Sequence, residues 1–342
     1  MAIKDSDFEK IRKQILDSER PLFFYDDDPD GLISFLLLYR FKGFGKGIMV
    51  KSTPELKGEY ASKVNEYLPD LVVVLDKPMI SNEFLEQVTV PILWIDHHAP
   101  QEPRGSQYFN PRIDKDSDNS PTSYQSYKIA DSSEDIWLAM IGCVSDWYLP
   151  DFKDGFIKKY PDLLSKEHDT PPKALFDSKM STLCKIFSFI LKGKSSQINK
   201  MIKIMSRIDD PYELLNHTSP RGKLVYKYFE EMETEYQSIY KRIDTSDPKI
   251  IKFFYEENKV SFTSDMSNEL LHRNPEKVIM IGRKKGNEFK MSLRSTKHNL
   301  PEILKYALKS VKGYGGGHTN ACGCVVNEKD FDKFYKQFKD NL

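Results

Sequence analysis

Acidic side chains close three short apolar segments of the chain. The segments are residues 22–25, 71–75 and 91–95, and the aspartates that end them are Asp26, Asp76 and Asp96. Short apolar runs of this kind predict buried strands of a parallel sheet. Because chemistry gathers at the carboxyl ends of the strands in open α/β sheets, we expect the three aspartates to converge on one edge.

Two more carboxylates and two histidines extend this set. Asp28 and Asp30 follow the first aspartate at every second position, and His97 and His98 follow the third directly. If the first segment stays extended, its alternating carboxylates share one face. Clustered carboxylates raise one another's pKa unless a cation offsets them, and mixed oxygen and imidazole donors suit Mn²⁺, Mg²⁺ or Zn²⁺. An isolated acidic stretch would more often be a solvated loop, but the neighbouring strand ends favour a metal site.

A fourth acidic position follows another apolar run. Residues 136–144 are apolar and lead through Ser145 to Asp146. We expect Asp146 to stand at a strand end like the first three aspartates. It would then join the same cluster and add another oxygen ligand for a metal ion.

The surrounding segments alternate between predicted strands and helices. Helices are predicted near residues 5–18, 32–41, 84–85 and 124–130, and residues 103–123 are predicted to form an irregular loop. A βαβ series of this kind predicts a parallel-sheet α/β domain over residues 1–150.

Two further regions complete the chain. Residues 151–245 are predicted to be mostly helical and to end in a long amphipathic connecting helix at 222–243. Residues 246–342 are predicted to form a smaller α/β domain. Its expected strands are 250–255, 278–281, 289–293 and 321–326, and its expected helices are 301–310 and a last one from residue 329.

The composition predicts a soluble globular protein. Of the 342 residues 39% are hydrophobic and 30% are charged, and the formal net charge is zero. No apolar run approaches the ~20 residues that span a bilayer, and the first residues lack the apolar core of a signal peptide. Four cysteines do not make a disulfide framework at this length. We therefore expect a reduced, cytoplasmic setting without a membrane partner.

The order of these motifs resembles that of the DHH phosphoesterase superfamily, in its RecJ-like nuclease and nanoRNase group. Residues 26–31 are similar to the first motif in its RecJ-type form, and residues 96–98 to the third. Asp76 and Asp146 match the second and fourth motifs. In the C-terminal part, residues 290–295 and 312–318 resemble the Ser-x-Arg-Ser strand and the Gly-Gly-Gly-His motif of the DHH-associated domain.

Two positions depart from the family pattern. Related small-molecule phosphatases carry a histidine near the start of the first motif, where this chain has Phe24 or Asp26. This difference points toward the RecJ-like nucleases. Lys77 and Pro78 follow the second motif's aspartate, where Cys-Gly or a histidine is more familiar. The surroundings of Asp76 are therefore expected to differ from those in relatives.

The resemblance implies a role for each motif residue. One metal ion would be held by Asp26, Asp28, Asp76 and Asp146, and a second by Asp30, Asp76, His97 and Asp146, with some ligands shared. His98 would lie near the scissile phosphate, and Asp96 is grouped with it as catalytic because a carboxylate commonly fixes a histidine tautomer. A substrate phosphate would be bound by Arg294, Ser295, Gly315, Gly316, Gly317 and His318. The expected cofactor is Mn²⁺, two ions per site, with Mg²⁺ as the alternative.

These roles predict a phosphodiesterase or exonuclease that hydrolyses single-stranded DNA or RNA from an end by a two-metal mechanism. Basic residues concentrate at 185–207 and 283–297, and these stretches could line the path of a strand despite the zero net charge. Three alternative substrates remain open: short oligonucleotides, a cyclic dinucleotide or a nucleotide phosphate. An inactive replication scaffold is disfavoured because the ligand set is intact. Cys322 and Cys324 are expected to be buried in a strand.

Overall fold

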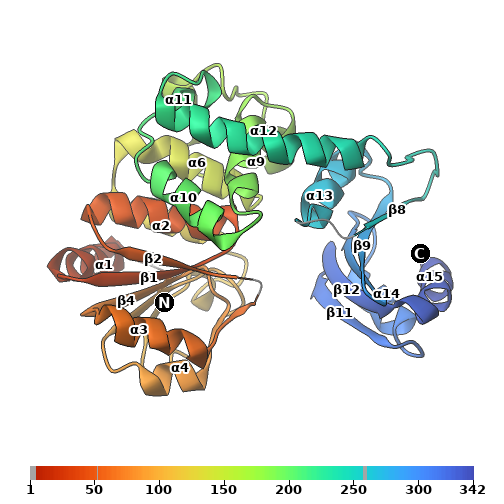
Figure 1. The fold of residues 1–342 in the computed structure, drawn as a ribbon, viewed down its shortest axis with the longest axis horizontal. Coiled ribbons are helices and arrows are strands. Elements are labelled where there is room, and N and C mark those ends of the chain that lie inside the picture. Colours follow the sequence, from red (N-terminus) through yellow and green to blue (C-terminus); the bar gives the residue numbers. More distant parts are fainter. Residues whose placement is uncertain (1–4, 52, 257–259) are drawn as a thin grey trace. The chain divides into compact units, whose positions relative to one another are not determined.

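The computed structural model describes residues 5–51, 53–256 and 260–342 (Figure 1). The chain forms two compact units, one that ends at Tyr228 and one that begins at Phe229. The first four residues, for which no signal peptide is expected, lie outside the described residues. No helix within the described part of the chain combines the length and the apolar character that crossing a bilayer requires.

A five-stranded parallel sheet forms the centre of the first unit. Its strands, in spatial order, are β2 (Lys46–Val50), β1 (Pro21–Asp26), β4 (Leu71–Leu75), β6 (Ile92–Ile95) and β7 (Gln107–Phe109). The three strands predicted from apolar runs are confirmed as β1, β4 and β6, and all of their pairings are parallel. Their side chains are buried on both faces, which explains why they are apolar throughout rather than alternating.

Helices cover both faces of this sheet (Figure 1). On one face lie α2 (Pro29–Lys42), α5 (Thr122–Ala130) and α6 (Ile136–Ser145), and on the other α3 (Ala61–Tyr67) and α4 (Asn82–Gln87). The second face has a core that includes Phe24, Val74 and Phe84. The predicted first helix is confirmed as α1 (Asp5–Asp17).

Two expectations for this unit are wrong. The run before Asp146 is the helix α6 and not a strand; its residues from Ile136 to Val144 are all buried, and a wholly apolar run of this length does not reveal its period. The segment 103–123 is not wholly irregular, since it contains β7 and a short 3₁₀ turn, Pro111–Ile113. β7 has only three residues and depends on pairing with β6, so the sequence alone does not reveal it.

The predicted helical region is confirmed. It consists of α7 (Lys153–Lys159), α8 (Pro171–Phe176), α9 (Met180–Ile190), α10 (Ser195–Met205), α11 (Pro211–Leu215) and α12 (Pro220–Tyr240). The helix α12 is the expected long amphipathic one, and the boundary between the two compact units falls within it. Two short strands, β3 (Glu55–Leu56) and β5 (Met79–Ile80), pair beside the main sheet of the first unit.

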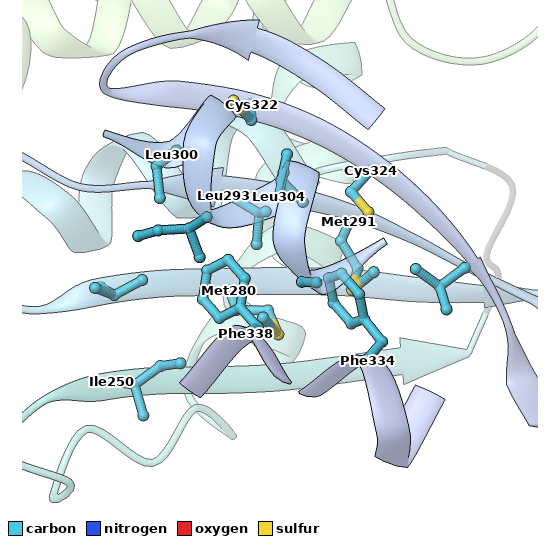
Figure 2. Close-up of a cluster of buried hydrophobic side chains, with 14 of the residues drawn as sticks. Ile250, Met280, Met291, Leu293, Leu300, Leu304, Cys322, Cys324, Phe334 and Phe338 are labelled. Carbon is cyan, nitrogen blue, oxygen red and sulfur yellow. The ribbon is translucent and has the colours of Figure 1, made fainter. Parts of the chain in front are cut away.

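The second unit contains a mixed five-stranded sheet in the order β11-β12-β10-β9-β8. Its elements are β8 (Ile250–Glu256), α13 (Thr263–Arg273), β9 (Val278–Lys285), β10 (Glu288–Arg294), α14 (Leu300–Ala307), β11 (Gly313–His318), β12 (Ala321–Asn327) and α15 (Phe331–Lys339). Figure 2 shows its core, where Met280, Leu293, Leu304 and Phe334 pack together. Cys322 and Cys324 belong to this core, as predicted.

Candidate active site

The strand register places three aspartates side by side at the carboxyl edge of the parallel sheet. Tyr25 pairs with Leu75, and Leu75 pairs with Ile95. Asp26, Asp76 and Asp96 occupy the next position on the three adjacent strands, so the expected convergence is confirmed.

The carboxylates of Asp28 and Asp30 are placed by a helix and not by an extended segment. Asp28 is the N-cap of α2, and its Oδ1 accepts a hydrogen bond of 2.9 Å from the amide of Gly31. Proline at the first helical position after a capping aspartate starts a helix, so the expected alternation along an extended strand is wrong. A side chain at Gly31 would come within 2.7 Å of the backbone nitrogen of Asp26, and glycine therefore allows this helix to begin so close to β1.

Asp30 is buried and holds the start of α5. Its two carboxylate oxygens accept hydrogen bonds of 2.9 Å from the backbone amides of Thr122 and Ser123. Burial and the nearby charge of Asp28 raise the pKa of Asp30 to about 7, and the two amide bonds only partly offset them. The first-motif aspartate is thereby fixed in position by a helix about 90 residues later in the sequence.

Asp76 lies at the centre of the cluster in an unusual backbone conformation. Its φ of 59° is left-handed, which aspartate tolerates better than most residues. The side chain is 1% exposed, and its Oδ1 lies 3.4 Å from Nε2 of His97. Burial, together with the charges of Asp30 and Asp28, raises the pKa of Asp76 well above its usual range. Burial also raises the pKa of Asp146, which ends α6 3.6 Å from the same histidine nitrogen.

Three overlapping groups of ligand atoms form among the described residues. The groups are Asp26 with Asp28 and Asp76, Asp30 with His97 and Asp146, and Asp76 with His97 and His98. In each group the ligand atoms lie within 4.8 Å of one another. The donor set fits hard or borderline divalent ions, because it combines carboxylate oxygens with imidazole nitrogen. The raised carboxylate pKa values fit as well, since a bound cation would stabilise the charged forms.

The two histidines of the third motif have different surroundings. Burial and the neighbouring His98 lower the pKa of His97 to about 4, which keeps its ring neutral and suited to metal binding. Burial alone would lower the pKa of His98 too, but its hydrogen bond to Asp96 and the nearby aspartates raise it. Nδ1 of His98 lies 2.7 Å from Oδ1 of Asp96, and the side chain is 34% exposed.

Asp96 is fully buried and orients His98. Its Oδ2 accepts hydrogen bonds from the His98 amide and from the side chains of Tyr108 and Asn110. Asn110 also donates to the carbonyl of His98 at 2.9 Å. Through these bonds, the strand β7 and the residue after it hold the tripeptide Asp96-His97-His98 in place. The sequence does not single out Tyr108 or Asn110, because both lie in the segment expected to be irregular.

Without a bound cation, the protein is expected to lose stability as the pH rises from about 4 to 7. In this interval Asp26 and Asp30, whose folded pKa is about 7, keep protons that the unfolded chain has released at a pKa near 3.8. The unfolding free energy therefore falls with rising pH. His97 acts in the opposite sense, but the raised pKa values of Asp76 and Asp146 add to the loss.

Calorimetry in EDTA at pH 5 and pH 7.5 measures this dependence. The melting temperature should be lower at pH 7.5, and added Mn²⁺ should raise it more at pH 7.5 than at pH 5. A melting temperature in EDTA that rises over this interval would contradict the electrostatic description of the cluster.

Two of the predicted phosphate-binding residues, Arg294 and His318, lie on the same face of the second unit's sheet. Arg294 on β10 and His318 on β11 are both registered with Ala321 on β12. Residues directly opposite one another point to the same face, so the two side chains flank the small Ala321. Nε of Arg294 donates to Asn268 of α13 at 2.7 Å, which fixes one side of the guanidinium. The sequence alone does not indicate that Asn268 contacts Arg294.

The glycine run forms the exposed edge strand β11. A side chain at Gly315 would come within 2.7 Å of the Gly323 carbonyl oxygen, and Gly317 has a φ of 148°. Nothing restricts a side chain at Gly316 within 4 Å. Two of the three glycines are thus required by the sheet itself, while all six residues of the strand are exposed.

Ser295 differs from the other predicted phosphate ligands. Its side chain is 1% exposed, and its hydroxyl oxygen accepts hydrogen bonds of 3.2 Å from the amides of Lys297 and His298. This hydroxyl holds the loop that follows β10. A direct contact with substrate would require these bonds to rearrange.

Two protein-family models match parts of this chain. The model of the DHH family, N-terminal domain, matches residues 22–143, and the model of the DHHA1 domain matches residues 246–342. No curated protein matches the chain by sequence.

Solved structures share the fold at low sequence identity. RecJ from Thermus thermophilus in complex with Mn²⁺ aligns over 98% of this chain and 54% of that protein, with a TM-score of 0.70 and 15% identity. An exonuclease RecJ bound to manganese aligns over 98% and 93%, with a TM-score of 0.60 and 16% identity. A pGpG-specific phosphodiesterase from Vibrio aligns over 95% and 100%, with a TM-score of 0.54 and 13% identity.

This chain spans about half the length of the Thermus RecJ. The likeness to all three structures concerns the fold of a parallel-sheet unit, a helical region and a C-terminal mixed sheet. The two family models match in the same order along the chain. The chain therefore belongs to the DHH superfamily, with the DHH phosphoesterase fold and a C-terminal DHHA1 domain.

Proposed function

We propose that this protein is a metal-dependent phosphodiesterase that hydrolyses single-stranded nucleic acid from an end. The observation that carries the proposal is the cluster of carboxylates around Nε2 of His97, which lies 3.4 Å from the buried Asp76 and 3.6 Å from the partly buried Asp146. Uncompensated carboxylates in such a place are costly, and divalent ions are the partners that their geometry suits. The likeness to manganese-bound RecJ structures supports this reading.

Two groups of side chains would hold the two metal ions. Asp26, Asp28 and Asp76 would hold one ion, and Asp30, His97 and Asp146 the other. Asp76, whose Oδ1 lies 3.4 Å from Nε2 of His97, would be near enough to serve both. When bound, two divalent ions supply the Lewis acidity that an in-line displacement at phosphorus needs. The nitrogen ligand His97 should favour Mn²⁺ over Mg²⁺.

His98 would contact the substrate. Its Nδ1 is engaged by Asp96, which leaves Nε2 for an oxygen of the scissile phosphate. The hydrogen bond to Asp96 and the raised pKa of His98 both favour a ring that donates a proton or a hydrogen bond there. In the second unit, the guanidinium of Arg294 would bind another phosphate through two parallel hydrogen bonds, and His318 would lie beside it.

The second candidate is a phosphodiesterase for dinucleotides. One observation favours it: this chain aligns with the whole of the pGpG-specific phosphodiesterase from Vibrio. We favour single strands because the described residues of segment 283–297 carry a concentration of basic side chains, which would contact the phosphates of a longer ligand.

Product analysis on end-labelled 2-mers and 20-mers of DNA and RNA with Mn²⁺ separates these candidates. We expect the single-stranded 20-mer to be degraded to mononucleotides and a blunt duplex to be attacked little. Binding should weaken as salt rises, because phosphate contacts displace counterions. Much faster cleavage of 2-mers would establish the dinucleotide function instead, and no cleavage of either would indicate an inactive scaffold.

A further inference from the structure

A buried lysine lies beside the candidate metal ligands. Lys77 directly follows Asp76, and its side chain is 0% exposed, which is rare for lysine. Its Nζ lies 2.8 Å from Oδ1 of Asp26 and also donates to the carbonyl oxygen of Thr53. The ammonium group is therefore paired inside the protein with one of the carboxylates that would hold a metal ion.

The backbone around Lys77 fixes this arrangement. The left-handed φ of Asp76 turns the chain at the end of β4, and the indole nitrogen of Trp94 donates to the Lys77 carbonyl at 2.9 Å. Asp26 ends the adjacent strand β1, so the lysine reaches it across one strand spacing. The Lys77 side chain is 0% exposed, so its ammonium group depends on Asp26 and Thr53 for hydrogen bonds.

The lysine affects the ligand groups unequally. Asp26 belongs to the group with Asp28 and Asp76 and not to the group formed by Asp30, His97 and Asp146. An ion in the first group would share Asp26 with a fixed positive charge and would be repelled by it. In a partly buried site, a unit charge several ångströms away changes binding by a few kcal/mol, which is about 10- to 1,000-fold in affinity.

We propose that Lys77 is a resident cation of the metal centre that makes its two halves unequal. One divalent ion binds tightly at Asp30, His97 and Asp146, and binding at Asp26, Asp28 and Asp76 is weakened by the ammonium group. This inference rests on the metal centre of the proposed function. It assigns Lys77 a positioning and charge-balancing role, since its side chain is buried and its ammonium group contacts Asp26 and Thr53.

Mn²⁺ binding to the full chain tests the inference without reference to activity. Equilibrium dialysis and Mn²⁺ electron paramagnetic resonance would be compared for the wild type, Lys77→Met and the control Lys63→Met, whose lysine is exposed and pairs with Glu66. The wild type should bind one Mn²⁺ at least about tenfold more tightly than the second. Its spectrum at one equivalent should be that of an isolated ion.

The Lys77→Met change should strengthen the second binding event by at least about tenfold, so that a spin-coupled pair forms at lower Mn²⁺. The affinity for the first ion should change much less, and Lys63→Met should match the wild type. Two equal sites in the wild type, or an unchanged second affinity in Lys77→Met, would overturn the inference. If Lys77→Met does not fold, Lys77→Gln takes its place, because glutamine removes the charge and can still donate a hydrogen bond to Asp26.

Hydrolysis of a labelled 20-mer in the same samples separates this inference from the proposed function. A wild type that binds Mn²⁺ at two equal sites and cleaves the 20-mer refutes only the role of Lys77. A wild type that neither binds Mn²⁺ nor cleaves nucleic acid refutes both.

Discussion

The Asp76→Asn protein is expected to lose Mn²⁺-dependent hydrolysis by on the order of 10³-fold or more, while its fold stays intact. Asp76 belongs to two of the three ligand groups, one with Asp26 and Asp28 and one with His97 and His98. Losing metal-centred stabilisation of the transition state costs several kcal/mol. Asparagine keeps the size of the side chain and tolerates the left-handed backbone at this position. Steady-state kinetics with saturating Mn²⁺ measure the effect.

A matched control is available elsewhere in the first unit. Asp131 also has a left-handed backbone, with a φ of 50°, and it ends α5 with its side chain 84% exposed. The Asp131→Asn change should leave hydrolysis and Mn²⁺ affinity at wild-type values. In EDTA at pH 7.5, the Asp76→Asn protein should melt no earlier than the wild type, because one repelling charge is gone. Wild-type rates in Asp76→Asn would refute the site.

Removing the guanidinium of Arg294 is expected to lower kcat/KM by about 10- to 100-fold and to spare Mn²⁺ affinity. A charged hydrogen bond to a phosphate contributes roughly 1.5–3 kcal/mol, and Arg294 can form two in parallel. The Arg294→Lys protein should recover part of the loss, because it keeps the charge without the fork. His318→Ala should act in the same direction, since His318 flanks Ala321 from the other side.

The control for this prediction is Arg273→Ala. Arg273 lies on α13 in the same unit, is 53% exposed and pairs with Glu269, so its loss should leave kcat/KM unchanged. Mn²⁺ affinity should be measured for every variant. Unchanged kinetics in both Arg294→Ala and His318→Ala, or a lost Mn²⁺ affinity in either, would show that the phosphate is bound elsewhere.

Three strands of the main sheet, β1, β4 and β6, could be predicted because they are buried on both faces and are therefore continuously apolar. The strand β2 is only partly buried and was not predicted. The same continuous apolar character explains the wrong prediction for α6. This helix is fully buried and shows no amphipathic period, so its apolar run predicts a strand. The strand β7 escaped prediction because three residues carry no period, and its existence depends on its neighbour β6. The helix α13 was missed as well, although Met266 and Leu270 on it are buried.

The candidate metal ligands could be predicted because each is a charged or imidazole side chain next to an apolar run. The residues that hold these ligands could not, because their partners are distant in sequence. Thr122 binds Asp30 and Asp76 through its amide and hydroxyl, and Asn110 binds Asp96, only once α5 and β7 are in place. Lys77 stood out only as an unusual residue after Asp76, and its ion pair with Asp26 depends on the pairing of β1 with β4.

The most direct test of metal-dependent hydrolysis uses one labelled single-stranded 20-mer and the purified chain, first stripped with EDTA and then supplied with Mn²⁺. The wild type should release mononucleotides only after Mn²⁺ is added, and Asp76→Asn should release none under the same conditions. Hydrolysis that persists in EDTA, or that proceeds equally in Asp76→Asn, would contradict the account.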